Sequence, residues 1–188
     1  FFLSVGTIEP RKAYPIALAA FEKLWAQGDE RIYVIVGRAG WNTTTLQKLI
    51  KSHPEYGRKL YWFAHANDAD LRLFYQQAQA LVFPSFAEGF GMPLVEALYY
   101  GASVIASDIP VFREVGGEDV CYFSLLDAGS LQKQILAIGG IAKKHTRPDL
   151  VSWPQSAAQL VEMINHERYQ INQQQWADHF KQRDLSIN

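Results

Sequence analysis

The chain has 188 residues, 48% of them hydrophobic, and carries 18 Lys and Arg against 19 Asp and Glu. This composition predicts one soluble globular domain or at most two small ones, and the near-neutral charge argues against the basic face typical of sequence-independent nucleic-acid binding. Apolar runs such as 32–36 are far shorter than the roughly 20 residues of a membrane-spanning helix, and the lone Cys121 excludes a disulfide-stapled scaffold and favours a reducing cytoplasm.

The first five residues, Phe1–Val5, have the composition of a buried strand. No initiator Met precedes them, and the basic flank and cleavage site of a signal peptide are not seen. We therefore expect this chain to be a domain of a longer polypeptide.

Short apolar runs rich in β-branched and aromatic residues alternate along the chain with segments of helical periodicity. The helical spacing is clear in the segments 16–25 and 71–78. Strands this apolar, separated by amphipathic helices, predict an α/β fold with a doubly wound parallel sheet covered on both faces. The predicted strands are Phe1–Val5, Ile32–Val36, Leu60–Phe63, Leu81–Phe83, Ser103–Ala106 and Val120–Phe123.

Residues that favour helix ends support this alternation. Asp68 is the expected N-cap of one helix, while Pro93 and Gly101 suit the first turn and the end of the next. Asp127 and Ser152 are the expected N-caps of the last two helices.

The composition changes near residue 165, after which Asn and Gln dominate. We expect a domain over residues 1–165. Residues 166–188 are then a polar C-terminal tail, which forms either a peripheral helix that docks elsewhere, such as a crossover helix, or a frayed end.

Unusual residues gather where the predicted strands end. Ligands of open parallel sheets bind outside the carboxyl ends of the strands, and four such ends lead into the segments 6–12, 37–40, 84–93 and 107–110. Parallel strands bring all four segments to one rim of the sheet. We therefore expect the binding site at this rim.

Glycines, a helix start and two cations predict an anion site at the rim. Gly89 and Gly91 let the backbone approach closely, and the amides of the helix that starts near Pro93 point outward. Arg11 and Lys12 add positive charge. Each pair alone is explained by turn glycines or by solvated cations at a helix start, but together at one rim they favour a diphosphate site.

Two glutamates, Glu88 in the loop and Glu96 in the expected first turn of the next helix, stand near these cations. A carboxylate can accept two hydrogen bonds from a vicinal diol, as carboxylates do with ribose in dinucleotide folds. The plainer reading of Glu96 is a surface glutamate that interacts favourably with the helix dipole.

The string Glu88–Leu98 (Glu-Gly-Phe-Gly-Met-Pro-Leu-Val-Glu-Ala-Leu) is followed by Gly101 and by Ser107-Asp108-Ile109-Pro110. Together these residues resemble the retaining glycosyltransferases of family 4, also called group 1. The segment Val5–Lys12 (Val-Gly-Thr-Ile-Glu-Pro-Arg-Lys) resembles the opening motif of the same family. Both motifs occur in order on the expected loops, and the resemblance covers roughly residues 1–165.

The resemblance implies the C-terminal half of a GT-B enzyme, a Rossmann-like domain that binds a nucleotide-sugar donor, with the acceptor bound by an N-terminal domain absent from this chain. It implies that Glu88 contacts the donor sugar and that Arg11 and Lys12 contact the diphosphate leaving group, all three as catalytic residues. It also implies that Glu96 binds the ribose hydroxyls. The other donor-binding residues that it implies are Gly6, Thr7, Phe90, Gly91, Met92, Leu94 and, beside the base, Gly37, Ala64 and His65.

One position departs from the family. Many members carry Arg directly after the glycine of the opening motif, where this chain has Thr7, and Arg11 is the expected substitute. The Thr variant and the string Glu-Pro-Arg-Lys look like members that use GDP-mannose in bacterial O-antigen or exopolysaccharide assembly. The resemblance thus implies a hexosyltransferase with GDP-mannose as donor, and UDP- or ADP-sugars as the other candidates.

The resemblance implies no obligatory cofactor or metal, and the five histidines lack the paired spacing of zinc sites. The expected partners are a nucleotide sugar and a glycan or lipid-linked acceptor, with the full protein in the cytoplasm or at the cytoplasmic face of the inner membrane. Alternatives are a nucleotide-binding or regulatory module without transferase activity and a GT-B sugar-nucleotide epimerase. A dehydrogenase is disfavoured because the first strand does not lead into Gly-x-Gly-x-x-Gly.

Overall fold

The structure, a computed structural model, describes residues 1–127, 129–138 and 153–165. The chain divides into two compact units, Phe1–Pro148 and Asp149–Asn188. Helix α7 (Trp153–Asn165) is the described element of the second unit. The expected domain boundary at residue 165 stays a prediction, and the predicted tail 166–188 lies outside the described residues.

A parallel sheet of six strands forms the centre of the first unit, in the order β3-β2-β1-β4-β5-β6. The strand order reverses between β1 and β4, which are neighbours in space, and this switch point is where doubly wound sheets bind ligands. The predicted α/β class is confirmed, and each strand agrees with its predicted bounds to within one residue. The strands are β1 (Phe2–Val5), β2 (Tyr33–Val36), β3 (Leu60–Phe63), β4 (Ala80–Phe83), β5 (Ser103–Ser107) and β6 (Val120–Phe123).

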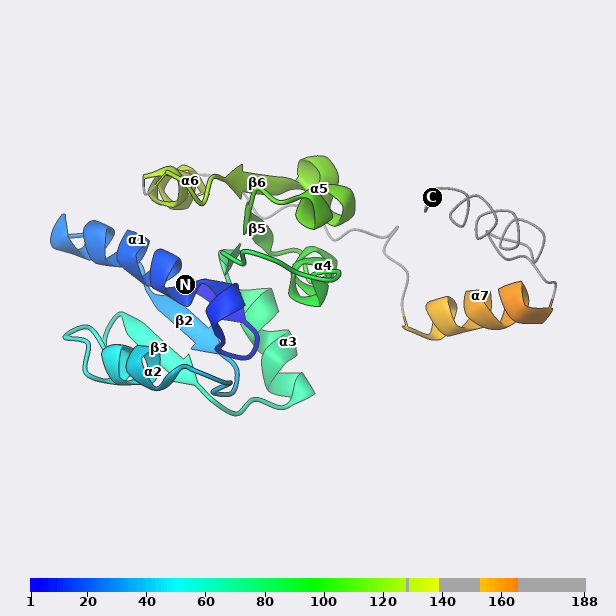
Figure 1. The fold of residues 1–188 in the computed structure, drawn as a ribbon, viewed down its shortest axis with the longest axis horizontal. Helices are drawn as coiled ribbons and strands as arrows, with labels where there is room; N and C mark the ends of the chain where they lie inside the picture. Colours follow the sequence, from blue (N-terminus) through cyan, green and yellow to red (C-terminus); the bar gives the residue numbers. More distant parts are fainter. Residues whose placement is uncertain (128, 139–152, 166–188) are drawn as a thin grey trace, which may run out of the picture. The chain divides into compact units, whose positions relative to one another are not determined.

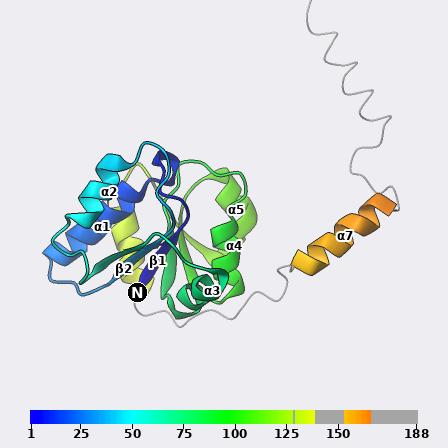
Figure 2. The same cartoon turned by 90° about the horizontal axis from the view of Figure 1, so that it is seen from below.

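Helices cover both faces of the sheet (Figures 1 and 2). Helices α1 and α6 pack against each other on one face, where α2 also contributes to the core, while α3, α4 and α5 lie side by side on the other. The helices are α1 (Tyr14–Ala26), α2 (Thr44–Lys51), α3 (Asp68–Gln77), α4 (Met92–Tyr99), α5 (Pro110–Gly116) and α6 (Ser130–Ile138), with short 3₁₀ turns η1 (Pro10–Lys12) and η2 (Gly117–Asp119). Among the described residues, no helix combines the length and apolar character needed to cross a bilayer.

Aromatic packing joins α1 to the sheet. The Phe21 ring stacks on Tyr33 with 4.4 Å between centroids and lies 5.6 Å from Phe2. All three side chains are fully buried. Strands β1, β2 and β4 are buried along their whole length, and apart from the buried Ser4 of β1 their sequences are apolar runs, which is why they were predictable.

The start of α3 corrects one predicted cap. Asn67, not Asp68, is the N-cap: its side chain accepts a hydrogen bond of 2.9 Å from the Asp70 amide, and the Asp70 carboxylate accepts one of 3.3 Å from the Asn67 amide. This reciprocal pair is a capping box, which needs a side-chain acceptor three positions after the cap, here Asp70. Asp68 is the first helical residue, where its charge complements the helix dipole.

The other predicted helix ends differ in their outcome. Pro93 lies in the first turn of α4, and Gly101 follows the end of that helix, as predicted. Asp127 stands three residues before α6 begins and accepts a hydrogen bond of 2.8 Å from the Gly129 amide, so it closes the preceding turn instead of capping a helical amide. Ser152 lies outside the described residues.

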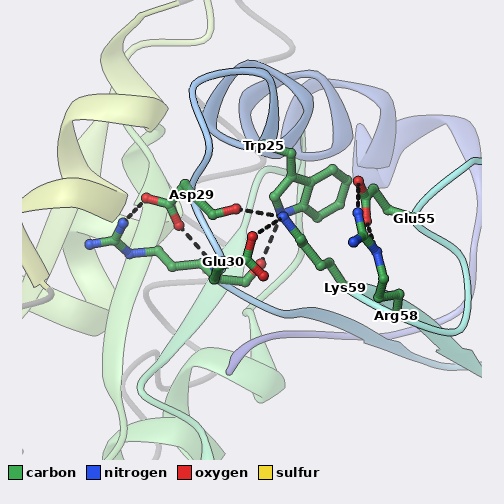
Figure 3. Close-up of polar contacts among 7 residues, drawn as sticks. Trp25, Asp29, Glu30, Glu55, Arg58 and Lys59 are labelled. Atoms are coloured by element: carbon green, nitrogen blue, oxygen red, sulfur yellow. Dashed lines mark hydrogen bonds and ion pairs between the residues drawn. The ribbon is translucent and has the colours of Figure 1, made fainter.

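Ion pairs tie together the segments that lead into β2 and β3, at the amino ends of these strands (Figure 3). The nearly buried Lys59 ammonium donates to the Asp29 carbonyl at 2.9 Å and pairs with Glu30 at 2.7 Å. Glu55 and Arg58 form a separate exposed pair. These contacts fix the loops of the rim opposite the predicted site, so they have a structural role.

Candidate functional site

The loops that follow β1 and β2 touch each other through glycine. A Cβ atom on Gly37 would lie 2.0 Å from the carbonyl oxygen of Gly6, so only glycine permits this approach. The Gly6 amide donates to Val36 and the Gly37 amide to Phe63, each at 2.9 Å. The carboxyl ends of β1, β2 and β3 are thereby held together in one wall.

A pocket of about 530 Å³ opens at this wall. It brings together five of the residues predicted for donor binding, namely Gly6, Thr7, Gly37, Ala64 and His65. The site residues that sequence reasoning predicted near the base thus share one pocket. Its further lining comes from Val5, Val36, Arg38, Ala66, Asn67, Asp70 and Leu71.

Three polar lining residues were missed from the sequence: Arg38, Asn67 and Asp70. Signals for them were present. Arg38 directly follows Gly37, a predicted site residue, and the spacing of Asn67 and Asp70 is that of a capping box at a helix start on the same rim. These side chains give the pocket both a cation and a carboxylate.

The two predicted phosphate-binding cations stand beside this pocket and share one carboxylate. Lys12 Nζ lies 2.7 Å from Glu88 Oε1, and Arg11 Nη1 lies 2.6 Å from Glu88 Oε2. The second guanidinium nitrogen of Arg11 pairs with Glu9 at 2.7 Å. A Cβ on Gly6 would lie 3.3 Å from Lys12 Nζ, so the ammonium abuts a backbone that lines the pocket.

Lys12 and Glu88 form their pair away from solvent. Their side chains are 8% and 7% exposed, whereas that of Arg11 is 46% exposed. The Lys12 ammonium also lies 4.8 Å from the centroid of the Phe83 ring, a cation–π contact. A backbone hydrogen bond of 2.8 Å from Phe86 to the Arg11 carbonyl joins the two loops that carry these groups.

Two buried serines, Ser85 and Ser107, orient the Glu88 carboxylate. Ser85 Oγ donates to Glu88 Oε1 at 2.7 Å, and Ser107 Oγ donates to the Ser85 carbonyl at 2.5 Å. Both serines are fully buried. Burial alone raises the pKa of the Glu88 carboxyl, but hydrogen bonds from Lys12, Ser85 and Arg11 outweigh it, so this pKa lies below its ordinary value and the group is charged at neutral pH.

Helix α4 begins at a glycine that its surroundings require. Gly91 has φ +93°, and a Cβ there would lie 2.9 Å from the Phe112 ring. A Cβ on Gly89 would meet no atom within 4 Å, so this loop faces open space. Phe90 is exposed at the same turn, and Met92 is the first helical residue, as the anion-site prediction requires.

Leu94, whose role in donor binding stays a prediction, lies in the first turn of α4. Its side chain is fully buried, and its amide donates to the Gly91 carbonyl at 2.9 Å. The helix start at Met92 turns this third residue toward the core. Leu94 therefore supports the rim from within and presents no side-chain surface to a donor.

Glu96 is the fifth residue of α4 and lies in its second turn, not in the first as predicted, because the helix begins at Met92. Its Oε2 accepts a hydrogen bond of 2.7 Å from the Tyr75 hydroxyl. Burial and the Glu96 carboxylate raise the pKa of Tyr75 well above its ordinary value. Tyr75 stands one turn after Leu71, which lines the pocket, whereas Glu96 and Tyr75 do not themselves line it.

Within residues 1–127, 129–138 and 153–165, no group of three or more His, Cys, Asp or Glu side chains could hold a metal ion. The predicted independence from metal stays a prediction, because it concerns donor binding.

Comparisons with known proteins identify the family of this chain. The sequence model of the family described as "Glycosyl transferases group 1" matches residues 1–138. The chain is 37% identical over 168 residues to the serotype-specific mannosyltransferase WbdA of Escherichia coli, which covers 87% of this chain and 21% of WbdA. It is 33% identical over 135 residues to the O-antigen chain mannosyltransferase RfbU of Salmonella typhimurium, covering 72% of this chain and 37% of RfbU.

The fold also matches solved structures. The C-terminal domain of a group 1 glycosyl transferase, LpcC of Francisella tularensis, superposes with a TM-score of 0.62 at 17% identity over 75% of this chain and 76% of that domain. A glycosyltransferase of Rickettsia africae superposes with a TM-score of 0.64 at 19% identity over 74% of this chain and 38% of that protein. The fold is the one expected for the C-terminal half of a GT-B protein.

The chain spans about a fifth of the length of WbdA and about a third of RfbU. The family model covers most of the first unit, including both motifs and the pocket residues. The chain therefore belongs to the glycosyl transferases of group 1.

Proposed function

We propose that this chain is the donor-binding domain of a retaining glycosyltransferase that transfers a hexose, mannose from GDP-mannose, in bacterial polysaccharide assembly. The observation that carries the proposal is the pair Arg11 and Lys12, which joins the loops after β1 and β4 at the switch point of the sheet and lies beside the pocket. The similarity to two mannosyltransferases, WbdA and RfbU, supports the sugar.

The proposed donor lies across the rim. Its base enters the pocket beside Gly37 and His65, and its diphosphate meets Arg11 and Lys12 together with the amides at the start of α4. As the sugar bond breaks, negative charge grows on the diphosphate. Fixed cations and amides that stabilise this charge lower the barrier without further reorganisation.

The two glutamates have separate tasks in this proposal. Glu96, held by Tyr75, accepts hydrogen bonds from the ribose hydroxyls. Glu88 stands next to the phosphate cations, near the proposed reacting carbon of the sugar. The acceptor hydroxyl attacks from the face that the diphosphate leaves, and it is bound by groups outside this chain.

The polar lining of the pocket favours guanine. Guanine presents two adjacent donors, N1–H and N2–H₂, and the Asp70 carboxylate can accept hydrogen bonds from both. Its O6 and N7 atoms can accept hydrogen bonds from the guanidinium of Arg38. Uracil and adenine lack this combination of edges. The donor proposal therefore predicts a preference for guanine nucleotides that depends on Asp70.

Calorimetric titration of the 188-residue chain with GDP, UDP and ADP tests the proposal. We expect GDP to bind most tightly, and Asp70→Asn to reduce this preference by about tenfold or more, since a charged acceptor is lost. Chelation with EDTA should leave GDP binding intact. Glu55→Gln, which breaks an exposed ion pair at the opposite rim, is the matched control. Failure of all three nucleotides to bind would refute the proposed function.

A further inference from the structure

The two cations proposed for the diphosphate both pair with carboxylates in the structure. One carboxylate, Glu88, takes both: Oε1 pairs with Lys12 at 2.7 Å and Oε2 with Arg11 at 2.6 Å. Each oxygen of the Glu88 carboxylate pairs with one cation, as two oxygens of a phosphate group would. Glu88 therefore occupies, in charge and in hydrogen bonding, the place that a donor phosphate needs.

Burial makes this pairing strong. With both side chains more than nine-tenths buried, Lys12 and Glu88 interact where water screens little. An anion that binds Lys12 must either displace Glu88 or share the ammonium with it. In either case the new anion enters a site that already contains a negative charge.

The structure allows the cations to change partner while the carboxylate stays. Ser85 Oγ holds Glu88 Oε1 at 2.7 Å, and the Ser85 backbone is itself fixed by Ser107. Arg11 is half exposed, and its other guanidinium nitrogen pairs with Glu9 at 2.7 Å, so the contact with Glu88 is one of two that hold it. Lys12 Nζ already abuts Gly6, whose backbone lines the pocket.

We propose that Glu88 is an internal counter-anion that competes with the donor diphosphate for Arg11 and Lys12. This inference rests on the proposed function and adds a task for Glu88 beyond contact with the sugar. By recapturing both cations, the carboxylate weakens the hold on the nucleoside diphosphate product and promotes its release. Glu88 thus acts on diphosphate affinity through the two cations, as a positioning residue.

The sign of a mutational effect separates this task from a purely structural one. If Glu88 only held the two loops together, its neutralisation would loosen the cations and weaken diphosphate binding. If it competes, Glu88→Gln removes the competing charge, keeps an acceptor for Ser85, and leaves Lys12 buried without its counter-charge until a diphosphate arrives.

The test is calorimetric titration of wild type and Glu88→Gln with GDP, inorganic pyrophosphate and guanosine. We expect GDP and pyrophosphate to bind the variant about tenfold more tightly, as the release of hydrogen bonds to charged groups implies. Guanosine, which has no phosphate, should bind both proteins equally. Glu55→Gln makes the same change of charge at the opposite rim and should leave all three affinities unchanged.

The outcomes separate this inference from the proposed function. If wild type binds GDP and Glu88→Gln binds it equally or more weakly, the competition is refuted and the donor site stands. If neither protein binds GDP or pyrophosphate, both proposals fail.

If Glu88→Gln does not fold, a second measurement on the wild-type chain tests the inference. In a crystal structure of the wild-type chain with GDP, we expect phosphate oxygens to replace Glu88 on at least one of the two cations. Retention of both contacts at 2.6–2.7 Å in that complex would overturn the inference.

Discussion

Glu96 is the residue of the rim whose environment most directly predicts a binding effect. It is charge-bearing, partly buried and held by Tyr75. Glu96→Ala removes a charged acceptor from two proposed ribose hydroxyls, so the affinity for GDP should fall roughly ten- to a hundredfold. Calorimetry with Tyr75→Phe as companion should show a smaller loss, because the carboxylate remains; unchanged GDP affinity in Glu96→Ala would exclude the ribose role.

The Glu88 ion pairs predict a defined pH dependence of stability. Because the folded pKa of Glu88 is depressed below the unfolded value of about 4.3, its pairing stabilises the fold above that pH and the contribution is lost as the pH falls through the folded pKa. Thermal unfolding of wild type and Glu88→Gln should therefore differ most at neutral pH, and the difference should shrink as the pH falls below the unfolded value of about 4.3. A difference that stays constant across this range would contradict the depressed pKa.

Side-chain chemistry at the rim was predictable only in part. The position of Arg11, Lys12 and Glu88 at one edge follows from their place after two strands that parallel pairing makes neighbours. Their mutual contacts do not, because they depend on the reach of long side chains and on the buried Ser85 beneath them. The hydrogen bond from Tyr75 to Glu96 was missed for the same reason, since it joins two helices through side-chain ends.

At the scale of elements, the start of α4 depends on one glycine and not on its neighbour. Gly91→Ala would place a Cβ at φ +93° and 2.9 Å from the Phe112 ring, which should lower the free energy of unfolding by about 1–3 kcal/mol and weaken GDP binding. Gly89→Ala meets open space and should leave stability unchanged. Chemical denaturation of both variants checks the contrast, and equal stability of the two would show that the helix start tolerates a side chain.

The elements themselves were predicted more accurately than their ends. The edge strands β3 and β6 match their predicted bounds although they are only partly buried, whereas the fully buried strands β1, β2 and β4 each differ from theirs by one residue. The cap of α3 was misplaced by one residue, because Asn67 and Asp68 are both favoured at N-caps and only the reciprocal bond with Asp70 distinguishes them. Composition alone does not contain that distinction.

At the scale of the molecule, the chain contains the donor side of the proposed active site. It spans about a fifth of WbdA, and the groups proposed to bind an acceptor lie outside it. We expect the purified chain to fold and to bind GDP weakly, since one wall of the cleft is open to water, yet to transfer no sugar. Incubation with GDP-mannose and a lipid-linked or oligosaccharide acceptor, followed by mass spectrometry, tests this; elongated product would place the acceptor site within these 188 residues.

The hydrogen bond that joins Phe86 to Arg11, and the ion pair beside it, link positions that lie 75 or more residues apart in the chain. The pocket for the base, in contrast, is built from residues 5–71 alone. During synthesis the base pocket can therefore assemble on the ribosome before the segment that carries Glu88 has emerged, whereas the phosphate site must wait for β4 to join β1. Nascent chains that end near residue 78 should not bind pyrophosphate. Binding of pyrophosphate should appear in a single step once α4 is complete.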